Sequence, residues 1–337
     1  MVKKDNQEIG GLLIATAEKI ETASFSDAVK MMQEYVERNP EQVDERMMAE
    51  IKLIEQMIGY RSMLKEWEYF RTMKLVYRYC EMRYTPILED TLNATVTELP
   101  EKDSIWWCWL QGYEAAPDLI KICYQSLGRL GKRIHIVTAD NYSEYIVLPE
   151  YIIEKWKAGI ISNTHFSDIL RLELLTKLGG TWIDSTVLCT AEEQIKRIMD
   201  NSKLFCFSYV MRDSINQEIL YDNWFLHSTA HSLILQDTKK MLYEFWKNED
   251  SAKHYFIFHL LFTIACRRHP EECKSIPVFS PEPCHVLQHE MMEPFSEERY
   301  QQILGMSGIH KLTYKYDQCS ELRGTFLEYI LERKEYN

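Results

Sequence analysis

The segment from Ser167 to Thr186 combines acidic, basic and glycine residues at a spacing that suits an anionic ligand. Asp168 and Arg171 are three residues apart, so a helix brings them to one face. A glycine pair then lets the backbone leave the helix and pass close to a bound molecule. Asp184 follows a short apolar run, where a carboxylate could hold a divalent cation against a diphosphate. The alternative is a helix cap, a surface ion pair and a turn.

Strands and helices alternate around this segment from about residue 100 onward. Apolar patterns predict strands at 104–110, 133–138 and 181–183, and helices at 117–130 and 168–178. This order, with short connections, predicts a mostly parallel sheet covered by helices. Ligands bind beyond the carboxyl ends of strands in such sheets, and Gln111 and Asp184 fall at such ends. After about residue 200 the pattern is mainly helical, most clearly at 233–246 and 255–266.

Residues 1–97 carry helical signals only. Helix starts and apolar spacing predict helices at 27–38, 47–58 and 60–84. No catalytic motif lies in this part, so we expect a helical N-terminal region at 1–97 and a catalytic domain at 98–337. Packing, oligomerisation and acceptor contact are open as roles of the N-terminal region.

The composition excludes some classes of protein and indicates a compartment. With 39 basic and 51 acidic residues, the net charge of −12 excludes an extended nucleic-acid-binding surface. The longest apolar run, at 256–265, is about half of the ~20 residues that cross a bilayer. The 9 cysteines are scattered without a CxxC pair, which fits reduced thiols. We therefore expect a cytoplasmic protein, with peripheral contact at the inner membrane surface left open.

One group of metal-ligating residue types lies near the C-terminal end of the chain. Its members are Cys266, His269, Cys273, Cys284, His285 and His289. Four of them could form a zinc site, but their spacing matches no familiar ligand pattern. Buried cysteines and helix-surface histidines are the reading we favour.

The segment described first also resembles a family signature. Ser-Asp-x-x-Arg, then about seven residues, then Gly-Gly-x-Trp-x-Asp is similar to glycosyltransferases of the capsular-polysaccharide-synthesis type, which are related to the GT-A α-mannosyltransferases and glycosylating toxins. Further similar stretches are 105–112, 223–225 and 310–315, so the resemblance covers about 104–316. It implies an α/β, GT-A-like (Rossmann-like) sheet with flanking helices that binds a nucleotide sugar through a DxD-like motif.

The resemblance implies a role for each matching residue of the central segment. Asp168 and Arg171 would contact the ribose, sugar or diphosphate of the donor, and Asp184 would hold a metal or the ribose. These three are the expected catalytic residues. Gly180 would belong to the donor-binding set.

The first predicted strand would supply the contacts to the nucleobase. At its end, Trp109 would stack on the base and Gln111 would lie against it. Trp106 and Trp107, earlier in the strand, are expected to be buried instead.

The cofactor implied by the resemblance is Mn²⁺ or Mg²⁺, with Asp184, Thr186 and His310 as ligands. Thr186 stands where the broader family has the second aspartate of its Asp-x-Asp motif. Loss of one negative charge should weaken the binding of a hard cation. Lys311 and Lys315 would neutralise the departing diphosphate.

The function implied is that of a hexosyltransferase. It would move a sugar from a nucleoside-diphosphate sugar, UDP preferred, to a glycan or lipid-linked acceptor in capsular or surface polysaccharide synthesis, with retention at the anomeric carbon. Two alternatives stay open. The acceptor could be a protein side chain, or the chain could be a scaffold that keeps the fold without catalysis.

Overall fold

The computed structural model describes residues 38, 61–88, 99–209, 218–229, 231–316 and 322–332. The chain divides into two compact units, Met1–Tyr79 and Cys80–Asn337. Helix α4 (Arg61–Tyr84) corresponds to the helix predicted at 60–84. Apart from residue 38, the helices predicted at 27–38 and 47–58 lie outside the described residues, and so does the predicted boundary at residue 97. None of the described helices has the length and apolar character that crossing a bilayer requires.

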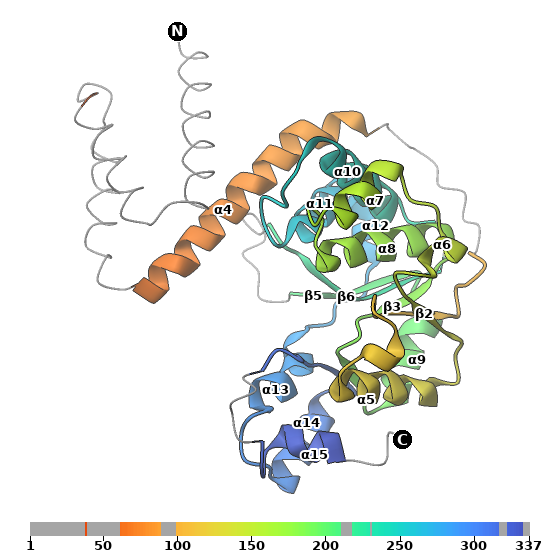
Figure 1. Ribbon diagram of the computed structural model, residues 1–337, viewed down its shortest axis with the longest axis vertical. Helices are drawn as coiled ribbons and strands as arrows, with labels where there is room; N and C mark the ends of the chain where they lie inside the picture. Colours follow the sequence, from red (N-terminus) through yellow and green to blue (C-terminus); the bar gives the residue numbers. More distant parts are fainter. Residues whose placement is uncertain are drawn as a thin grey trace. The chain divides into compact units, whose positions relative to one another are not determined.

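A five-stranded sheet with the order β2-β1-β3-β6-β5 forms the centre of the second unit (Figure 1). Its strands are β1 (Ile105–Cys108), β2 (Ile134–Val137), β3 (Gly180–Ile183), β5 (Leu204–Ser208) and β6 (Tyr221–Ser228). β2, β1 and β3 are parallel, whereas β6 is antiparallel to both β3 and β5. The predicted α/β class is therefore confirmed, with a sheet whose parallel strands are β2, β1 and β3.

The prediction of mainly helical structure after residue 200 missed β5 and β6. Every residue of these two strands is buried, so neither shows the in-and-out alternation of a half-exposed strand. β5 is a short and almost continuously apolar run, which is ambiguous between a buried strand and a buried helix, and β6 mixes apolar and polar residues without alternation. The helices predicted at 233–246 and 255–266 are present, as α10 and α11.

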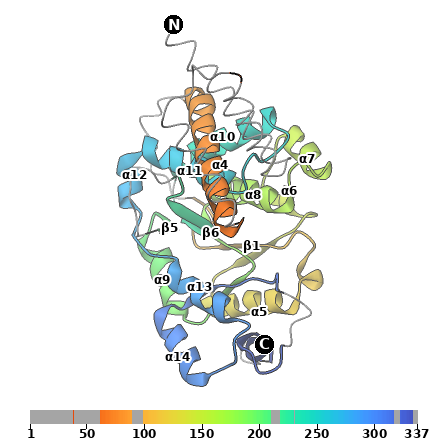
Figure 2. The ribbon, with the colours of Figure 1, turned by 90° about the vertical axis from the view of Figure 1, so that its left-hand side faces the viewer.

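Helices cover both faces of the sheet (Figures 1 and 2). On one face lie α6 (Tyr142–Tyr145), α7 (Glu150–Lys157), α8 (Asn163–Lys177), α10 (Leu233–Asn248), α11 (Ile257–Arg268) and α12 (Pro270–Ser275). On the other lie α5 (Asp118–Leu127), α9 (Glu192–Asn201), α13 (Glu282–Glu290), α14 (Glu297–Met306) and α15 (Phe326–Glu332).

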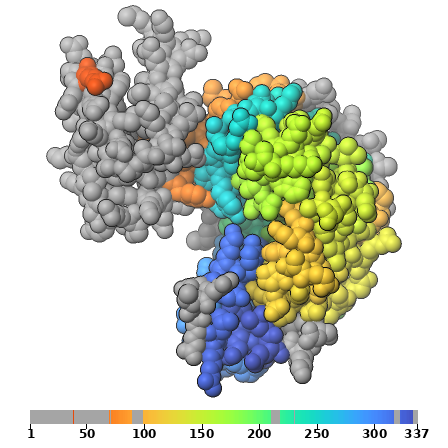
Figure 3. Space-filling model, viewed as in Figure 1, coloured from red at the N-terminus to blue at the C-terminus, as the bar shows by residue number. Residues whose placement is uncertain are grey.

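Strands β4 (Val187–Cys189) and β7 (Ile309–Lys311) form a separate two-stranded sheet. Short 3₁₀ turns are η2 (Thr85–Ile87), η3 (Tyr113–Ala115) and η4 (Gly128–Leu130). In the space-filling view, α7 and α8 (yellow-green) and the C-terminal helices (blue) form different parts of the surface (Figure 3).

Strand β1 is fixed by its two tryptophans, which point to opposite faces of the sheet. Trp106 stacks on His135 with ring centroids 4.3 Å apart. Trp107 makes an edge contact with Tyr124 at 5.0 Å. Both indoles are fully buried, as predicted. Packing on both faces fixes the end of β1. The position of Trp109, which directly follows the strand, is therefore fixed as well.

Helix α8 begins earlier than the sequence predicted. Its N-cap is Ser162, whose hydroxyl accepts a hydrogen bond from the backbone N–H of His165 at 3.3 Å. Ser167, which directly precedes the predicted helix start at residue 168, lies inside the helix and donates to the carbonyl of Thr164 at 2.7 Å. Asp168 and Arg171 consequently lie inside the helix, on its buried side.

A buried histidine in the sheet makes stability depend on pH. His227 on β6 bonds through Nδ1 to the hydroxyl of Thr181, its partner on β3, at 2.8 Å. Burial lowers the pKa of His227 to about 4. The unfolded chain takes up this proton below its ordinary pKa of about 6.5, so the contribution to stability is lost as pH falls from about 6.5 to 4.

We expect His227→Asn to reduce the acid sensitivity of the fold. Asparagine keeps a polar group near the Nδ1 position but cannot gain a charge. The free energy of unfolding should therefore fall less between pH 7 and pH 5 in the variant, by about 2 kcal/mol. Urea denaturation of both proteins at the two pH values measures this difference. Equal losses in the two proteins would contradict the prediction.

Candidate active site

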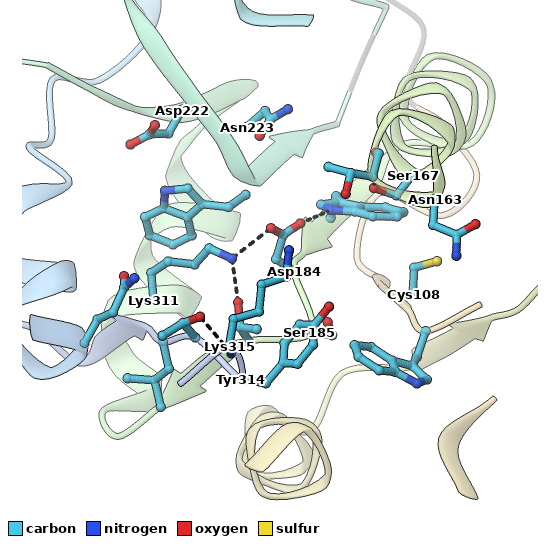
Figure 4. Close-up of a pocket in the computed structure, with 18 of the residues that line it drawn as sticks. Cys108, Asn163, Ser167, Asp184, Ser185, Asp222, Asn223, Lys311, Tyr314 and Lys315 are labelled. Carbon is cyan, nitrogen blue, oxygen red and sulfur yellow. Dashed lines mark hydrogen bonds and ion pairs between the residues drawn. The ribbon is translucent and has the colours of Figure 1, made fainter. Parts of the chain in front are cut away.

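A pocket of about 620 Å³ opens at one edge of the central sheet (Figure 4). The carboxyl ends of parallel β1 and β3 meet at this edge, and antiparallel β6 begins there. This is where ligands bind in sheets of this class. The predicted residues that line the pocket are Trp109, Gln111, Asp184, Thr186, Lys311 and Lys315.

Asp184 is held at the floor of the pocket by a tight turn after β3. Its backbone N–H donates to the carbonyl of Trp224 on β6 at 2.8 Å, which ties the turn to the sheet. The N–H of Val187 donates back to the carbonyl of Asp184 at 3.0 Å. The turn leaves the Asp184 side chain one quarter exposed, at 25 %.

The carboxylate of Asp184 is paired on both oxygens. Oδ1 accepts from the Arg171 guanidinium at 3.0 Å and from the Trp182 indole N–H at 2.8 Å. Oδ2 accepts from the Lys311 ammonium at 3.0 Å (Figure 4). Burial acts to raise the pKa of Asp184, but Lys311 and Arg171 together outweigh burial and hold it below its ordinary value. Asp184 is therefore ionised at neutral pH.

Asp168 and Arg171 lie behind the pocket and do not line it. Arg171 is 3 % exposed, with its guanidinium 4.9 Å from the Trp182 ring centroid. It bridges Asp184 to Asp168, whose Oδ1 lies 3.0 Å from it and also accepts from the Asn223 amide at 2.9 Å. Burial raises the pKa of Asp168 to about 6 despite the adjacent Arg171. The structure therefore places both residues behind Asp184, and the donor contact expected for them stays a prediction.

Lys311 reaches Asp184 because of the pairing between β4 and β7. Val187 is opposite Lys311 and Leu188 is opposite His310. Successive side chains of a strand point to opposite faces, so Lys311 faces the pocket while His310 faces the core. The His310 ring is fully buried and bonds through Nε2 to the Thr190 hydroxyl at 2.9 Å. The structure thus places the His310 ring in the core, on the other face of β7 from Lys311, and its role as a metal ligand stays a prediction.

The implied metal ligands do not form a divalent-cation site in this arrangement. The Lys311 ammonium donates to both Asp184 Oδ2 and the Thr186 hydroxyl. It thus uses the oxygens that a cation would need, and the third implied ligand, His310, faces the core. Within the described part of the chain, no three His, Cys, Asp or Glu side chains converge as a metal site.

Gly180 lies at the opposite end of β3 from Asp184 and does not line the pocket. Its φ of +100° is unfavourable for other residues. A Cβ there would lie 2.7 Å from the carbonyl oxygens of both Glu101 and Ser104. Gly180 thus packs closely against the carbonyls of Glu101 and Ser104, and the donor-binding role expected for it stays a prediction.

The β1 end of the pocket brings together an aromatic and cationic group. Trp109 lies against Tyr314 in an edge contact, with ring centroids 5.3 Å apart. Gln111 and Lys315 line the same pocket, so the predicted nucleobase contacts and the second lysine come together. Lys315 and Tyr314 are visible beside Lys311 in Figure 4.

Several lining residues were not predicted from the sequence. They are Tyr209, Asp222, Tyr255, His285 and Gln288. The available signal was the polar pair Asp222-Asn223 directly before the apolar run from Trp224 to Leu226, which marks the start of a strand at the binding edge. Reading this part of the chain as helical concealed that signal.

The six residues considered for zinc do not converge on one point in the described part of the chain, although Cys266 and Cys273 interact with each other. The His269 ring bonds to the Asp237 carboxylate at 2.7 Å. Cys284 Sγ lies 3.5 Å from the Ser307 hydroxyl, and His285 lines the pocket. Cys273 Sγ lies 3.3 Å from the Tyr221 hydroxyl.

Comparison with family models matches residues 58–330 to the family described as capsular polysaccharide synthesis protein. The chain belongs to this family. The match confirms the resemblance carried by the motifs. It begins well before residue 104, at residue 58, just ahead of α4. With it, the expected activity is confirmed at the level of a glycosyltransferase, which implies a nucleotide-sugar donor and an acceptor.

Two solved structures that are similar to this chain are described as glycosyltransferases. One is a "glycosyltransferase involved in the glycosylation of the major capsid of PBCV-1", with 12 % identity over 67 % of this chain and 97 % of that chain, and a TM-score of 0.32. Another is the "PaToxG Glycosyltransferase", with 9 % identity over 72 % of this chain and 95 % of that chain, and a TM-score of 0.32. A search of curated proteins gives no significant match.

Proposed function

We propose that this protein transfers a hexose from a nucleoside-diphosphate sugar, with UDP preferred, to a hydroxyl of a glycan or lipid-linked acceptor in capsular or surface polysaccharide synthesis. The observation that carries the proposal is the Lys311 ammonium, held on Asp184 at the floor of the pocket. A fixed cation in a partly buried site stabilises charge that develops on a leaving group.

The pocket has room and chemistry for each part of such a donor. The nucleobase stacks on Trp109 and contacts Gln111 at the β1 end, by analogy with the family. The diphosphate then lies toward Lys311 and Lys315, the two cations among the lining residues. Arg171 does not touch the donor in this proposal and holds the Asp184 carboxylate from behind.

The reaction needs charge stabilisation more than covalent help from the protein. The bond between the sugar C1 and the diphosphate oxygen breaks, and its electron pair stays on the diphosphate. Lys311 stabilises that negative charge, while the acceptor oxygen forms the new bond to C1 and its proton passes to the leaving diphosphate. This front-face route accounts for retention, which is carried over from the family.

We expect donor turnover to survive removal of divalent cations. Lys311 already places a positive charge on Asp184 Oδ2 and Thr186 Oγ1, so the site does not need a metal to neutralise the diphosphate. The test is a panel of nucleotide sugars scored for release of the nucleoside diphosphate in EDTA, in Mg²⁺ and in Mn²⁺. Release from one donor at a similar rate in all three conditions is the expected result.

Two other outcomes of this panel have distinct meanings. Release that stops in EDTA and returns with Mn²⁺ or Mg²⁺ would show that a metal displaces Lys311 from Asp184. No release and no shift in melting temperature with any nucleotide sugar would contradict the proposed function itself.

A further inference from the structure

The pocket continues beyond Lys311 to a group of residues that the donor does not need. Strands β1, β3 and β6 are neighbours in that order, so Cys108, Asp184 and Asp222 follow one another along the binding edge. Figure 4 shows Asp222 and Cys108 on opposite sides of Asp184. The β1 side carries the aromatic and cationic groups suited to a nucleotide. The β6 side of the pocket is therefore open to a ligand other than the nucleotide.

Asp222 is a buried carboxylate with unused hydrogen-bonding capacity. It is 9 % exposed, and its Oδ1 accepts from the Tyr209 hydroxyl at 2.8 Å. Its Oδ2 is buried and makes no hydrogen bond of normal geometry. Burial raises the pKa of Asp222, and nearby donors and cations, including the Trp224 indole and Lys311, only partly oppose this. An unsatisfied buried acceptor is unfavourable, so a ligand that donates to it gains binding energy.

The indole N–H of Trp224 supplies the matching donor. Trp224 and Asp222 are two residues apart on β6 and so share one face of the sheet. The indole Nε1 is buried, and its interaction with the Asp222 carboxylate falls short of normal hydrogen-bond geometry. A hydroxyl is both a donor and an acceptor. A single ligand hydroxyl can therefore donate to Asp222 Oδ2 and accept from Trp224 Nε1.

The surrounding side chains suit a saccharide. The Trp224 ring is stacked on Phe207, with centroids 4.6 Å apart, which fixes its plane. Helix α13 contributes His285, whose ring meets Trp224 edge-on at 5.9 Å, and Gln288, which bonds to His285 at 2.9 Å. A few polar groups around an aromatic wall are the usual composition of a small-molecule site. Sugars match it because they present hydroxyls at their edges and C–H groups on their faces.

Charge separates this region from the site of the diphosphate. A carboxylate that lacks a directly bonded cation repels phosphate groups, whereas Lys311 and Lys315 attract them. We propose that Asp222, Trp224, His285 and Gln288 form the acceptor subsite, which binds a neutral saccharide through a hydroxyl held between Asp222 and Trp224. This inference rests on the proposed function, because it places the acceptor beside the donor sugar.

The first experiment measures saccharide binding without a donor. The probes are octyl glycosides of glucose, galactose, mannose and N-acetylglucosamine, and binding is read by saturation-transfer NMR on the full chain. We expect at least one glycoside to bind. Asp222→Asn, which replaces an acceptor by a donor at nearly constant size, should weaken that binding about 50-fold. UDP affinity, measured by calorimetry, should stay within about twofold of the wild-type value, because the nucleotide lies at the other end.

A second variant tests the same subsite in case Asp222→Asn does not fold. Gln288→Ala alters a half-exposed position of α13, where alanine favours the helix. It should weaken the same glycoside about 5-fold. Gln301→Ala on α14, an exposed glutamine outside the pocket, is the matched control and should leave glycoside binding unchanged.

The second experiment follows transfer to the bound glycoside. With the donor that the nucleotide-sugar panel selects, Asp222→Asn should raise the KM for the glycoside and leave the KM for the donor near wild type. Equal weakening of donor and glycoside would place Asp222 on the donor sugar and overturn the proposal. Absence of glycoside binding in the wild type would also overturn it and would favour a protein acceptor. If no nucleotide sugar is turned over or shifts the melting temperature while the glycoside still binds, the result would contradict the proposed function and not the saccharide site.

Discussion

Lys311→Met is expected to lower donor turnover by about 10²–10³-fold, the usual loss when one preorganised charge or donor is removed from the site of a developing anion. Methionine keeps most of the length of the lysine side chain but carries no charge. The ammonium of Lys311 bonds to Asp184 and Thr186 at the pocket floor, so its removal leaves the leaving diphosphate without its nearest fixed cation. The rate of UDP release at saturating donor measures the effect.

The fold should tolerate this change. Lys311 is 20 % exposed, and Asp184 keeps its bonds to Arg171 and Trp182. Lys240→Met, at an exposed position of α10, is the matched control and should retain full turnover. A Lys311→Met enzyme with near-normal turnover and an unchanged melting temperature would show that Lys311 does not stabilise the leaving group.

Asp184→Asn provides an independent check of the same arrangement. Asparagine cannot hold two cations, so Lys311 loses its fixed position and Arg171 keeps only Asp168 as a charged partner. If the Lys311–Asp184 pair acts as a unit, the double variant should be little slower than either single variant. If the fold-loss in turnover of the double variant equals the product of the two single losses, Lys311 and Asp184 have separate roles.

The sequence predicted Asp184 and Lys311, at the centre of the pocket, better than the residues on its β6 side. Asp184 was predicted to lie at a strand end because an apolar run precedes it directly, and β3 ends there. Lys311 entered through the resemblance, and the structure brings it to Asp184. The direction of the His310 side chain could not be predicted from the sequence, because it depends on the register between β4 and β7. That register pairs Val187 with Lys311, residues that are distant along the chain.

The β6 side of the pocket was missed for a different physical reason. β6 is buried on both faces, so its hydrophobicity does not alternate and local periodicity cannot identify it as a strand. Without β6, nothing in the sequence connects Asp222 to Asp184. Asp168 and Arg171 show the converse case. Their helical spacing predicted the ion pair, but whether that pair faced the pocket or lay behind it depended on packing against Trp182 and Phe258.

Gly180→Ala is expected to destabilise the fold by about 4 kcal/mol, the sum of backbone strain and overpacking. The φ of +100° is strained for alanine, and the new methyl would lie 2.7 Å from two backbone carbonyl oxygens, those of Glu101 and Ser104. The carbonyl of Ser104 accepts from the N–H of Thr181 at 2.8 Å. It therefore cannot move away without breaking the start of β3.

Gly131→Ala separates the two contributions to this loss. Gly131 also has a positive φ, of +64°, but a Cβ there meets nothing within 4 Å. Its cost should be strain alone, about 1 kcal/mol. Urea unfolding of both variants measures the difference. Similar losses would show that the segment from Glu101 to Ser104 yields to the methyl group. A much larger loss for Gly180→Ala would show that the close packing of the start of β3 against the carbonyls of Glu101 and Ser104 requires a glycine.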